Sequence, residues 1–361
     1  MKKFTKLALV SSIALTTNAM AMQAMDDTAL SATTGQDGLS IGIGISKIEI
    51  EKLLIHDNDG LAPKGKAGEA GFGGTGADGA GAIVIKGNGL SVLDKDDVET
   101  NVVKDRGVVI GANYDNGGAY LLDSRNLADL VIDTDAGTGA NGAFINVAAQ
   151  VSGLDIKIGE IGVSASNDMP AANATSIRRG HSDTNYNAIL SGLEIKTGKM
   201  DANIQLGAAP QGAMVKLSTT MVGGLEIKNL GILDNSTKGK AVGSVDVDGT
   251  ATAVSTKEAG EIFIESIKIT DANSRNLKLD QNIQVFNDAY VGGGETLGKA
   301  AHIRIVSNDT GSAKDQYIKG IHLGSRNAAS IGDMEVQGLQ TYYSTSQGSY
   351  TKGAVITISG H

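Results

Sequence analysis

The sequence predicts an all-β protein, elongated as a β-solenoid or as a stacked β-sandwich or prism of many short strands. Apolar and polar residues alternate with a period of two along most of the chain, which is the pattern of half-buried strands. Clusters of Gly, Asn, Asp, Ser and Thr separate these segments and supply turn chemistry. The 49 glycines in 361 residues are about twice ordinary usage. No segment of twelve or more residues carries a clean helical stripe.

The first segment, residues 1–21, predicts export. Lys2, Lys3 and Lys6 precede an apolar run, and Ala19-Met20-Ala21 has the form that signal peptidase cleaves. We therefore expect cleavage between Ala21 and Met22. No later apolar run approaches the length of about 18 residues that a membrane-spanning helix needs, so no transmembrane segment is expected in the mature chain.

The next segment, residues 22–46, predicts one short N-terminal helix followed by the first strand. Asp26 and Asp27 suit a helix N-terminus, and the helix is expected to run to about Thr33. Gly35 can end it. The alternation of Ile41, Ile43 and Ile45 with small polar residues then predicts a strand over 39–45.

Residues 47–361 are expected to form the elongated β domain. Strands are predicted where the alternation is clearest, over 47–51, 154–158, 262–269, 303–305 and 355–358. The stretch 62–81 is low in complexity and rich in glycine, which predicts a loop. The small polar stretch 237–260 is the best candidate for a soft boundary.

Two short motifs recur inside this domain. Gly-Leu-acid-Ile-Lys occurs at 153–157, 192–196 and 224–228, and Ser-Arg-Asn occurs at 124–126, 274–276 and 325–327. Recurrence of one strand type suits stacked solenoid coils. The unequal intervals equally suit long hairpins in an extended sandwich or prism, so both architectures stay open. The arginines of the triplets are interpreted as turn residues, with a ladder for a ligand as the alternative.

Composition and charge exclude several classes of function. The chain has 0 Cys and 0 Trp, which excludes disulfides, thiolate metal sites and thiol nucleophiles. Loss of three lysines with the signal peptide takes the formal net charge from −9 to −12. That balance disfavours nucleic acids and anionic membrane surfaces as partners.

Candidate sites are sparse. Two pairs of carboxylates stand two residues apart as in calcium loops, but without the Gly and Glu of an EF-hand. One further Asp lies in a glycine stretch that resembles a calcium-binding nonapeptide. These calcium candidates are Asp57, Asp59, Asp78, Asp133 and Asp135. Asx turns explain them more simply. Gly71 to Gly76 matches G-x-G-x-x-G without the strand and helix that a dinucleotide site needs. No catalytic motif is found among the scattered histidines, and no cofactor is expected.

The segment after the predicted cleavage site reads M-x-x-M-D-D-x-x-L-S-x-x-T-G-Q-D-G-[LI]-x-I from Met22 to Ile41. This string resembles the start of exported proteins of Gram-negative bacteria, among them the FilA-type pilus-system proteins. The resemblance covers about 20 to 30 residues and brings no catalytic residues. It implies a β-rich protein of the cell surface or the pilus (fimbrium).

These observations lead to one expected function and one rival. We expect a secreted or cell-surface, non-enzymatic structural protein that is pilus-associated or adhesive, with other pilus or surface proteins as partners. Association with the outer membrane and a small-molecule ligand both stay open. The rival is an extracellular β-helical polysaccharide lyase or hydrolase, which predicts carboxylates converging in a groove.

Overall fold

The computed structural model describes residues 38–58, 60, 79–89, 92–93, 99–100, 104–138, 142–239, 243–245, 251–253, 258–287, 301–308 and 312–359. The prediction of an all-β protein is confirmed, because strands make up nearly all of its regular structure. The predicted helix over 26–33, the cleavage site and most of the glycine-rich stretch 62–81 lie outside the described residues.

Most strands belong to two large antiparallel sheets. The first sheet has nine strands, in the spatial order β1 (Leu39–Ile43), β8 (Ala128–Asp135), β9 (Phe144–Val151), β14 (Met200–Gly207), β15 (Val215–Met221), β20 (Leu277–Phe286), β21 (His302–Asn308), β25 (Ser349–Ser359) and β24 (Tyr342–Ser346). The second sheet has twelve strands. Nine lie in the order β2 (Lys47–Ile50), β7 (Val108–Ala112), β10 (Leu154–Ile158), β13 (Leu193–Lys196), β16 (Leu225–Asp234), β12 (Asn187–Leu190), β11 (Glu160–Ala165), β4 (Gly81–Lys86) and β3 (Leu53–Asp57).

The other three strands of the second sheet continue it beyond β16. They are β19 (Gly260–Asp271), β22 (Lys314–Gly324) and β23 (Ser330–Leu339). Two small hairpins stand apart from both sheets, β5 (Val92–Leu93) with β6 (Glu99–Thr100), and β17 (Gly243–Val245) with β18 (Ala251–Ala253). Within the described ranges the helical elements are single turns, α3 (Asp115–Gly118), η3 (Asp183–Asn185) and η4 (Asn235–Thr237). Among the described residues, no helix is both long and apolar enough to cross a membrane.

The chain runs back and forth through both sheets as a meander of long, bent strands. One such long strand consists of three consecutive segments, β9, β10 and β11. Together they cover residues 144–165 and pass from the first sheet into the second. The segment β1, β2 and β3 does the same over 39–57. Eight such strands lie side by side, and β23 with β25 forms the last of them.

Each long strand bends at two lines that we call the first and second corners. At the first corner the strands leave the first sheet, and backbone hydrogen bonds tie neighbouring bends together, such as Ser152 N–H to Leu127 O and Thr197 N–H to Leu154 O. The second corner divides the second sheet. There Gly159 donates its N–H to Gly107 O, and Asn229 and Gly320 both adopt positive φ, a conformation that Gly and Asn tolerate best.

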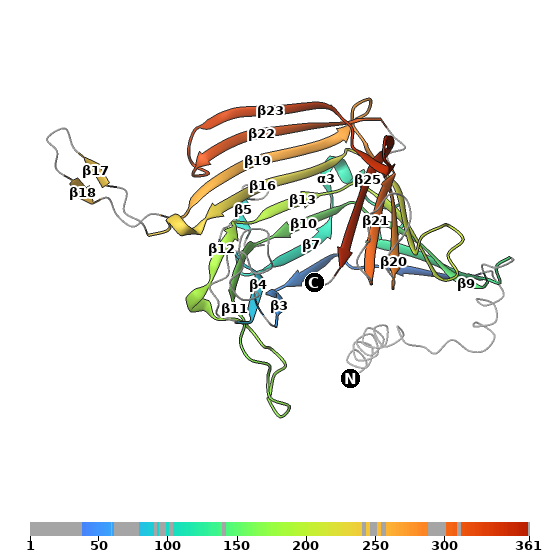
Figure 1. The fold of residues 1–361 in the computed structure, drawn as a ribbon, viewed down its shortest axis with the longest axis horizontal. Helices are drawn as coiled ribbons and strands as arrows, with labels where there is room; N and C mark the ends of the chain where they lie inside the picture. The colour runs from blue at the N-terminus through green and yellow to red at the C-terminus, as the bar shows by residue number, and fades with distance from the viewer. Residues whose placement is uncertain are drawn as a thin grey trace, which may run out of the picture.

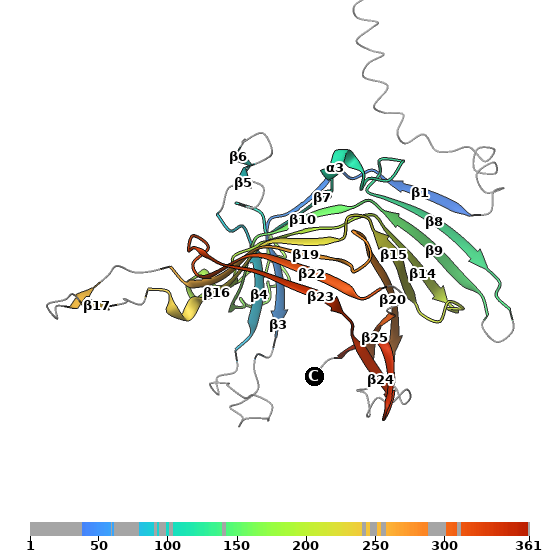
Figure 2. The ribbon, with the colours of Figure 1, turned by 90° about the horizontal axis from the view of Figure 1, so that it is seen from above.

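The two corners divide the meander into three panels, which we call the first wall, the floor and the second wall. The first wall is the first sheet, the floor contains β2, β7, β10 and β13, and the second wall contains β3, β4, β11 and β12, while β16, β19, β22 and β23 extend from floor to second wall (Figure 1). Seen along the stack of strands, the panels form an arch that is open on one side (Figure 2). The molecule is therefore a trough.

This architecture differs from the solenoid and from the stacked sandwich or prism. Every strand pairing between described residues is antiparallel, whereas a solenoid stacks its coils in parallel. The long strands pass from the first large sheet into the second at the first corner. The two sheets therefore follow one another around the arch and do not lie face to face. The finer prediction is thus not confirmed, although the all-β, many-stranded character is.

Few apolar side chains are fully buried. The buried ones in the described part of the chain include Leu121 and Leu122 at the first corner and Val84 in the second wall. Most apolar strand residues stay half-buried or exposed. The apolar surface of the trough is thus not the interior of a two-layer fold.

Candidate functional site

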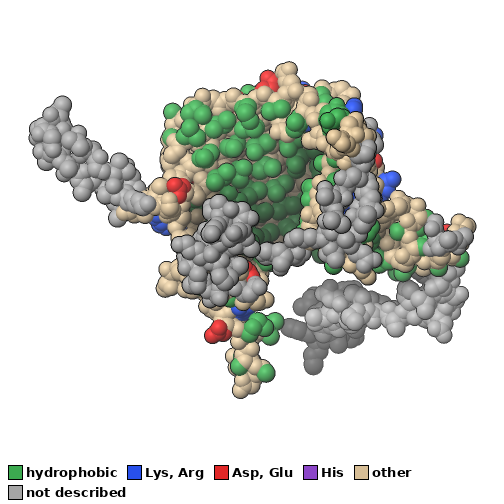
Figure 3. Space-filling view, viewed as in Figure 1, with side chains coloured by type: hydrophobic (Ala, Val, Ile, Leu, Met, Phe, Trp, Pro, Cys, Tyr) green, Lys and Arg blue, Asp and Glu red, His purple; other side chains and the backbone are tan. Residues whose placement is uncertain are grey.

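The inner face of the floor is an unbroken apolar ladder across eight strands. Isoleucines stand at one register position in seven neighbouring strands, and a methionine completes the row: Ile48, Ile110, Ile156, Ile195, Ile227, Ile267, Ile318 and Met334. Strands lie about 4.8 Å apart, so seven spacings give the row a length of about 34 Å. Figure 3 looks into the trough and shows the floor as a continuous apolar surface.

A second apolar row follows the second wall. Its members also face each other in register: Leu53, Ile85, Ile161, Leu190, Ile232, Ile262 and Leu323. The floor and this wall present the same face because each strand places two residues, instead of one, between successive apolar positions at the second corner. Ile158 and Ile161 show this spacing, as do Ile264 and Ile267. Without that extra residue the apolar side chains would switch faces.

A third apolar row follows the first wall, in register across its strands: Leu39, Ile132, Val147, Ile204, Val215, Ile283, Ile305 and Ile356. The opposite face of this wall carries Asp129, which accepts hydrogen bonds from Ser124 Oγ and Asn126 Nδ2. Ser124 and Asn126 belong to the segment after α3, and α3 lies on the outer side of the arch. Because neighbouring residues of a strand face opposite ways, the apolar row faces the inside of the trough.

The outer face of the floor carries alternating charges. The three Gly-Leu-acid-Ile-Lys repeats lie on β10, β13 and β16, which are neighbours. Antiparallel pairing brings the acid of one repeat opposite the lysine of the next, giving the rows Asp155, Lys196, Glu226, Lys268 and Lys157, Glu194, Lys228. Opposite charges across a strand pair are favourable, so the repeat encodes an ionic outer face and an apolar inner face together.

Lys196 is the best connected residue of these rows. Its Nζ lies 2.7 Å from Asp115 Oδ2, 3.5 Å from Glu194 Oε1 and 4.0 Å from Asp155 Oδ2. Burial opposes the charged form of Lys196, but the hydrogen bond to Asp115 and the neighbouring carboxylates outweigh it and raise the lysine pKa. Burial and the nearby Asp155 carboxylate raise the pKa of Glu194. These carboxylates therefore neutralise lysines on the outside of the molecule.

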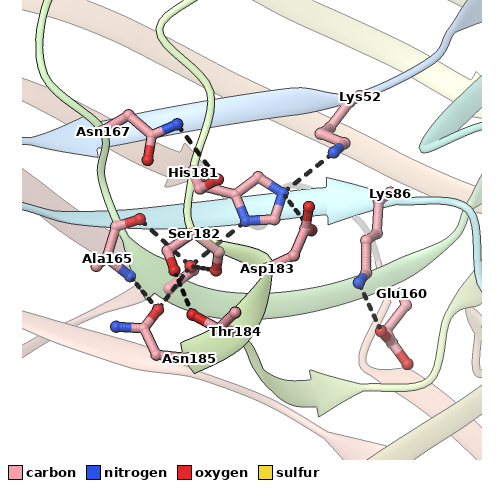
Figure 4. Close-up of polar contacts among 11 residues, drawn as sticks. Lys52, Lys86, Glu160, Ala165, Asn167, His181, Ser182, Asp183, Thr184 and Asn185 are labelled. Carbon is pink, nitrogen blue, oxygen red and sulfur yellow. Dashed lines mark hydrogen bonds and ion pairs between the residues drawn. The ribbon is translucent and has the colours of Figure 1, made fainter.

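A polar cluster around His181 closes the outer face of the second wall, where segment 166–186 crosses β4 and β11. The imidazole is buried, with Nε2 3.1 Å from Lys52 Nζ and 3.5 Å from Asp183 Oδ1 (Figure 4). Burial and the Lys52 charge lower the pKa of His181. Ser164, beside it, donates to Asn185 Oδ1 at 3.0 Å. The cluster fixes a crossing segment and contributes nothing to the inner face.

Tyr186 completes that covering segment. The Cβ of an alanine in place of Gly162 would lie 2.4 Å from the Tyr186 ring, so the ring packs directly on the Gly162 backbone. Lys86 Nζ lies 3.6 Å from the ring centroid, a cation–π contact. Burial, and then the Glu160 carboxylate, raise the pKa of the Tyr186 phenol.

A second polar cluster lies on the outer face at the second corner. The Arg326 guanidinium donates to Glu261 Oε1 at 2.7 Å, to Glu261 Oε2 at 3.1 Å and to Ser191 Oγ at 2.7 Å. Burial acts to raise the pKa of Glu261, but the bonds from Arg326 and Ser191 outweigh it and lower that pKa. The guanidinium also lies 4.9 Å from the centroid of the Phe263 ring. This cluster joins the tip of the β22–β23 hairpin to β19 and to the bend between β12 and β13.

A groove of 690 Å³ lies on the outer face of the second wall. It lies between β3 and segment 169–180 and is lined by Lys52, Leu54 and Ile177 among others. Its two arginines are engaged: Arg178 pairs with Glu51 at 3.4 Å, and Arg179 donates to Asn58 Oδ1 at 2.6 Å. The groove therefore offers no free pair of cations for an anionic ligand.

The structure does not gather the calcium candidates that it describes. Asp133 and Asp135 lie on β8 in the first wall, while Asp57 ends β3 in the second wall. Asp135 Oδ1 accepts the Gly137 N–H at 2.6 Å, which is an Asx turn. Asp59 and Asp78 lie outside the described residues. Within the part of the chain that is described, no group of three or more His, Asp or Glu side chains is placed to hold a metal ion.

The Ser-Arg-Asn triplets are turns of one type. In each, the serine Oγ accepts the N–H of the asparagine two residues later, at Asn126, Asn276 and Asn327. The triplets at 124–126 and 274–276 lie at the first corner, and the triplet at 325–327 lies at the β22–β23 tip. Their arginines lie at separate bends of the chain and do not form the ladder considered from sequence.

The sequence did not reveal the trough, the Arg326–Glu261–Ser191 cluster or the His181 cluster. The rows of the trough follow from alternation that is visible in the sequence, but their alignment depends on which strands pair. Glu261 and Arg326 are separated by 65 positions, and no spacing rule links them.

Comparison with known proteins gives one match. No curated protein and no solved structure matches the chain. Residues 1–104 match the model of a family of unknown function, DUF6160.

Proposed function

We propose that this protein is an exported, non-enzymatic protein that holds an extended acyl chain of an amphiphile in its trough. The observation that carries the proposal is the set of three apolar rows, which line the floor and both walls of one open hollow. Burying apolar surface is worth about 25 cal/mol per Å², so an extended apolar ligand gains free energy along the whole length of the rows.

The chemistry of the inner face favours an alkyl chain over a sugar or a peptide. The floor row consists of seven isoleucines, whose side chains neither donate nor accept hydrogen bonds, and one methionine, whose sulfur is only a weak acceptor. A sugar or a peptide backbone would lose its hydrogen bonds to water there without replacing them. A methylene chain has no such groups, and its length can follow the row.

The polysaccharide-active alternative has less support. The acids of the sequence repeats, Asp155, Glu194 and Glu226, lie on the outer face among lysines. Glycoside cleavage needs two carboxylates facing one another across a substrate. The N-terminal resemblance to FilA-type proteins supports a place at the cell surface or with the pilus, and an amphiphile-holding subunit is compatible with that place.

The test is binding of a spin-labelled stearic acid to the purified mature chain, followed by electron paramagnetic resonance. We expect the label to be immobilised by the wild-type protein. Ile232→Glu places a charge on the inner row at a side chain that is 43% exposed, and Val131→Glu places the same charge on the outer face at a side chain that is 42% exposed. We expect at least about tenfold weaker binding for Ile232→Glu and unchanged binding for Val131→Glu.

Two results would reject the proposal. The first is a label that stays mobile at every protein concentration. The second is equal loss of binding in both variants, because that would locate the contact outside the trough or reflect damage to the fold. Circular dichroism of each variant separates these causes.

A further inference from the structure

The two ends of the trough are open sheet edges. At one end the edge strands are β1 in the first wall, β2 in the floor and β3 in the second wall. At the other end they are β23, which extends from the floor to the second wall, and residues 354–359 of β25 in the first wall. The short strand β24 pairs only with residues 349–352 of β25. β24 therefore covers the part of this end at the first corner, and no other strand of the described residues covers either end.

The direction of the strands lets the two ends pair with each other. Eight strands alternate in direction from β2 to β23, since every step between them is antiparallel. The first and the last strand consequently run in opposite directions. A second copy placed end to end would present its β2 antiparallel to β23 and would continue the alternation without a break.

The register of the rows also continues across such a junction. The floor row ends in Met334 at one end and starts with Ile48 at the other, and the first-wall row ends in Ile356 and starts with Leu39. Placing Met334 beside Ile48 of a second copy brings Glu335 opposite Lys47. Cross-strand pairs of opposite charge are favourable.

One pair in this register is less favourable. The same alignment sets Asp333 opposite Glu49. Each carboxylate already has a partner of its own: Asp333 accepts the Tyr317 hydroxyl and the Gly320 N–H, and Glu49 pairs with Lys47 and Arg106. These bonds reduce the repulsion between the two carboxylates.

The first-wall ends lack the charged side chains that protect many edge strands, because β1 and residues 354–359 of β25 contain none, whereas the floor ends carry Lys47, Glu49, Asp333 and Glu335. Leu39 is 48% exposed and Ile356 is 55% exposed, and both lie on edge strands. Natural edge strands commonly carry lysine, proline or inward-pointing charges there. The irregular register of β23 around Gly332 restricts one part of its edge, but Met334 to Val336 pair regularly with β22 and leave a straight segment for a neighbour.

We propose that copies of this protein stack end to end, with β1 and β2 of one copy pairing to β25 and β23 of the next. The contact is heterologous, so each copy uses two different surfaces and the stack is an open filament. The troughs of successive copies then join into one channel. This inference does not depend on what the trough binds.

Sedimentation velocity of the full mature chain over a range of concentrations tests the proposal, with negative-stain microscopy of the same samples. We expect species that grow with concentration and filaments at the highest concentration. Leu39→Lys and Ile356→Lys each damage one end, and we expect both to abolish filaments. The matched control is Leu206→Lys, on the central strand β14, where the side chain is 47% exposed; this variant should still assemble.

A mixture of the two end variants gives a sharper result. Leu39→Lys keeps an intact β23 and β25 end, and Ile356→Lys keeps an intact β1 and β2 end. Mixed in equal amounts they should form dimers and nothing longer, while each alone stays monomeric. A wild-type protein that is monomeric at all concentrations, or a mixture without dimers, would overturn the proposal.

Cysteine cross-linking gives an independent readout, because the chain has 0 Cys. Directly opposed residues in an antiparallel pair have Cβ atoms about 5 Å apart, within reach of a disulfide. We expect Leu39→Cys mixed with Ile356→Cys to give a disulfide-linked dimer under mild oxidation. Ile356→Cys mixed with Leu206→Cys should give none, and a cross-link there equal to the first would count against the proposed contact.

Discussion

Removal of the Arg326 side chain should destabilise the second corner of the trough. In Arg326→Ala the Glu261 carboxylate, whose side chain is 7% exposed, would lose its counterion and the two hydrogen bonds from the guanidinium, while the backbone N–H of residue 326 could still donate to it. Removing one partner of a buried ion pair costs about 3–5 kcal/mol. The arginine side chain is itself 30% exposed and Ser191 still contacts the carboxylate, so we expect a loss of about 2–3 kcal/mol in the free energy of unfolding.

A double-mutant cycle with Glu261→Gln measures the coupling. Urea unfolding followed by circular dichroism gives the free energy for wild type, each single variant and the double variant. The double variant leaves no unpaired charge and should be no less stable than Arg326→Ala. Arg275→Ala is the control, since this exposed arginine holds the same place in the triplet at 274–276 and makes no ion pair with the described residues; it should change stability by less than about 0.5 kcal/mol.

A loss below about 0.5 kcal/mol in Arg326→Ala, or strictly additive effects in the cycle, would show that Arg326 and Glu261 are not coupled. The pH dependence adds a second check. The folded pKa of Glu261 is lowered from 4.5, so the unfolded chain binds this proton more readily. The stabilisation is complete above pH 4.5 and is lost as the pH falls through the folded pKa, and Glu261→Gln should remove that loss.

Two further predictions concern other parts of the outer face. Gly159→Ala would place a Cβ 2.2 Å from Lys86 O and 3.0 Å from Arg106 O, so we expect the free energy of unfolding in urea to fall by more than about 2 kcal/mol. Gly81→Ala is the control and should be tolerated, because the nearest neighbour of its Cβ would be Ser164 O at 4.0 Å. Equal losses in the two variants would contradict the expected clash at Gly159. Burial lowers the His181 pKa from 6.5, so wild type should lose stability as the pH falls from 6.5 to the folded pKa. His181→Asn should lose less over that interval in thermal unfolding, and an unchanged pH dependence would show that His181 is not responsible.

The strands of this fold are visible in the sequence. The alternation at 154–158 and 262–269 marks β10 and the centre of β19, and Leu39 marks the start of β1. The acid-Ile-Lys repeats identify strands of equivalent environment, and three of them are indeed neighbours. Repetition does not reveal direction, however. Reversal of the chain by hairpins at each end of the long strands gives an antiparallel meander, where the repeats alone suggested solenoid coils.

The trough itself was not predictable from local pattern. Its second corner depends on positions such as Asn229, Glu265 and Gly320, each of which adds one residue to an otherwise strict alternation. In a single strand such a residue looks like a local irregularity in the alternation of apolar and polar residues. Only the pairing places Asn229, Glu265 and Gly320 on a single line, where together they turn the sheet. The Arg326–Glu261 pair was equally hidden, because its members come from different long strands.

Alternation alone gives each long strand one apolar and one polar face, and a sheet with that pattern normally buries its apolar face against a second layer. Here the sheet bends toward its own apolar face, so the rows of the floor and walls approach one another without meeting. What remains uncovered is of two kinds, an apolar hollow and two sets of unpaired edge strands. An alkyl chain has no groups that could pair with an edge, and a second copy at the end cannot fill the hollow. The two proposals therefore address different surfaces, and stacking would extend the apolar path beyond the roughly 34 Å of one copy.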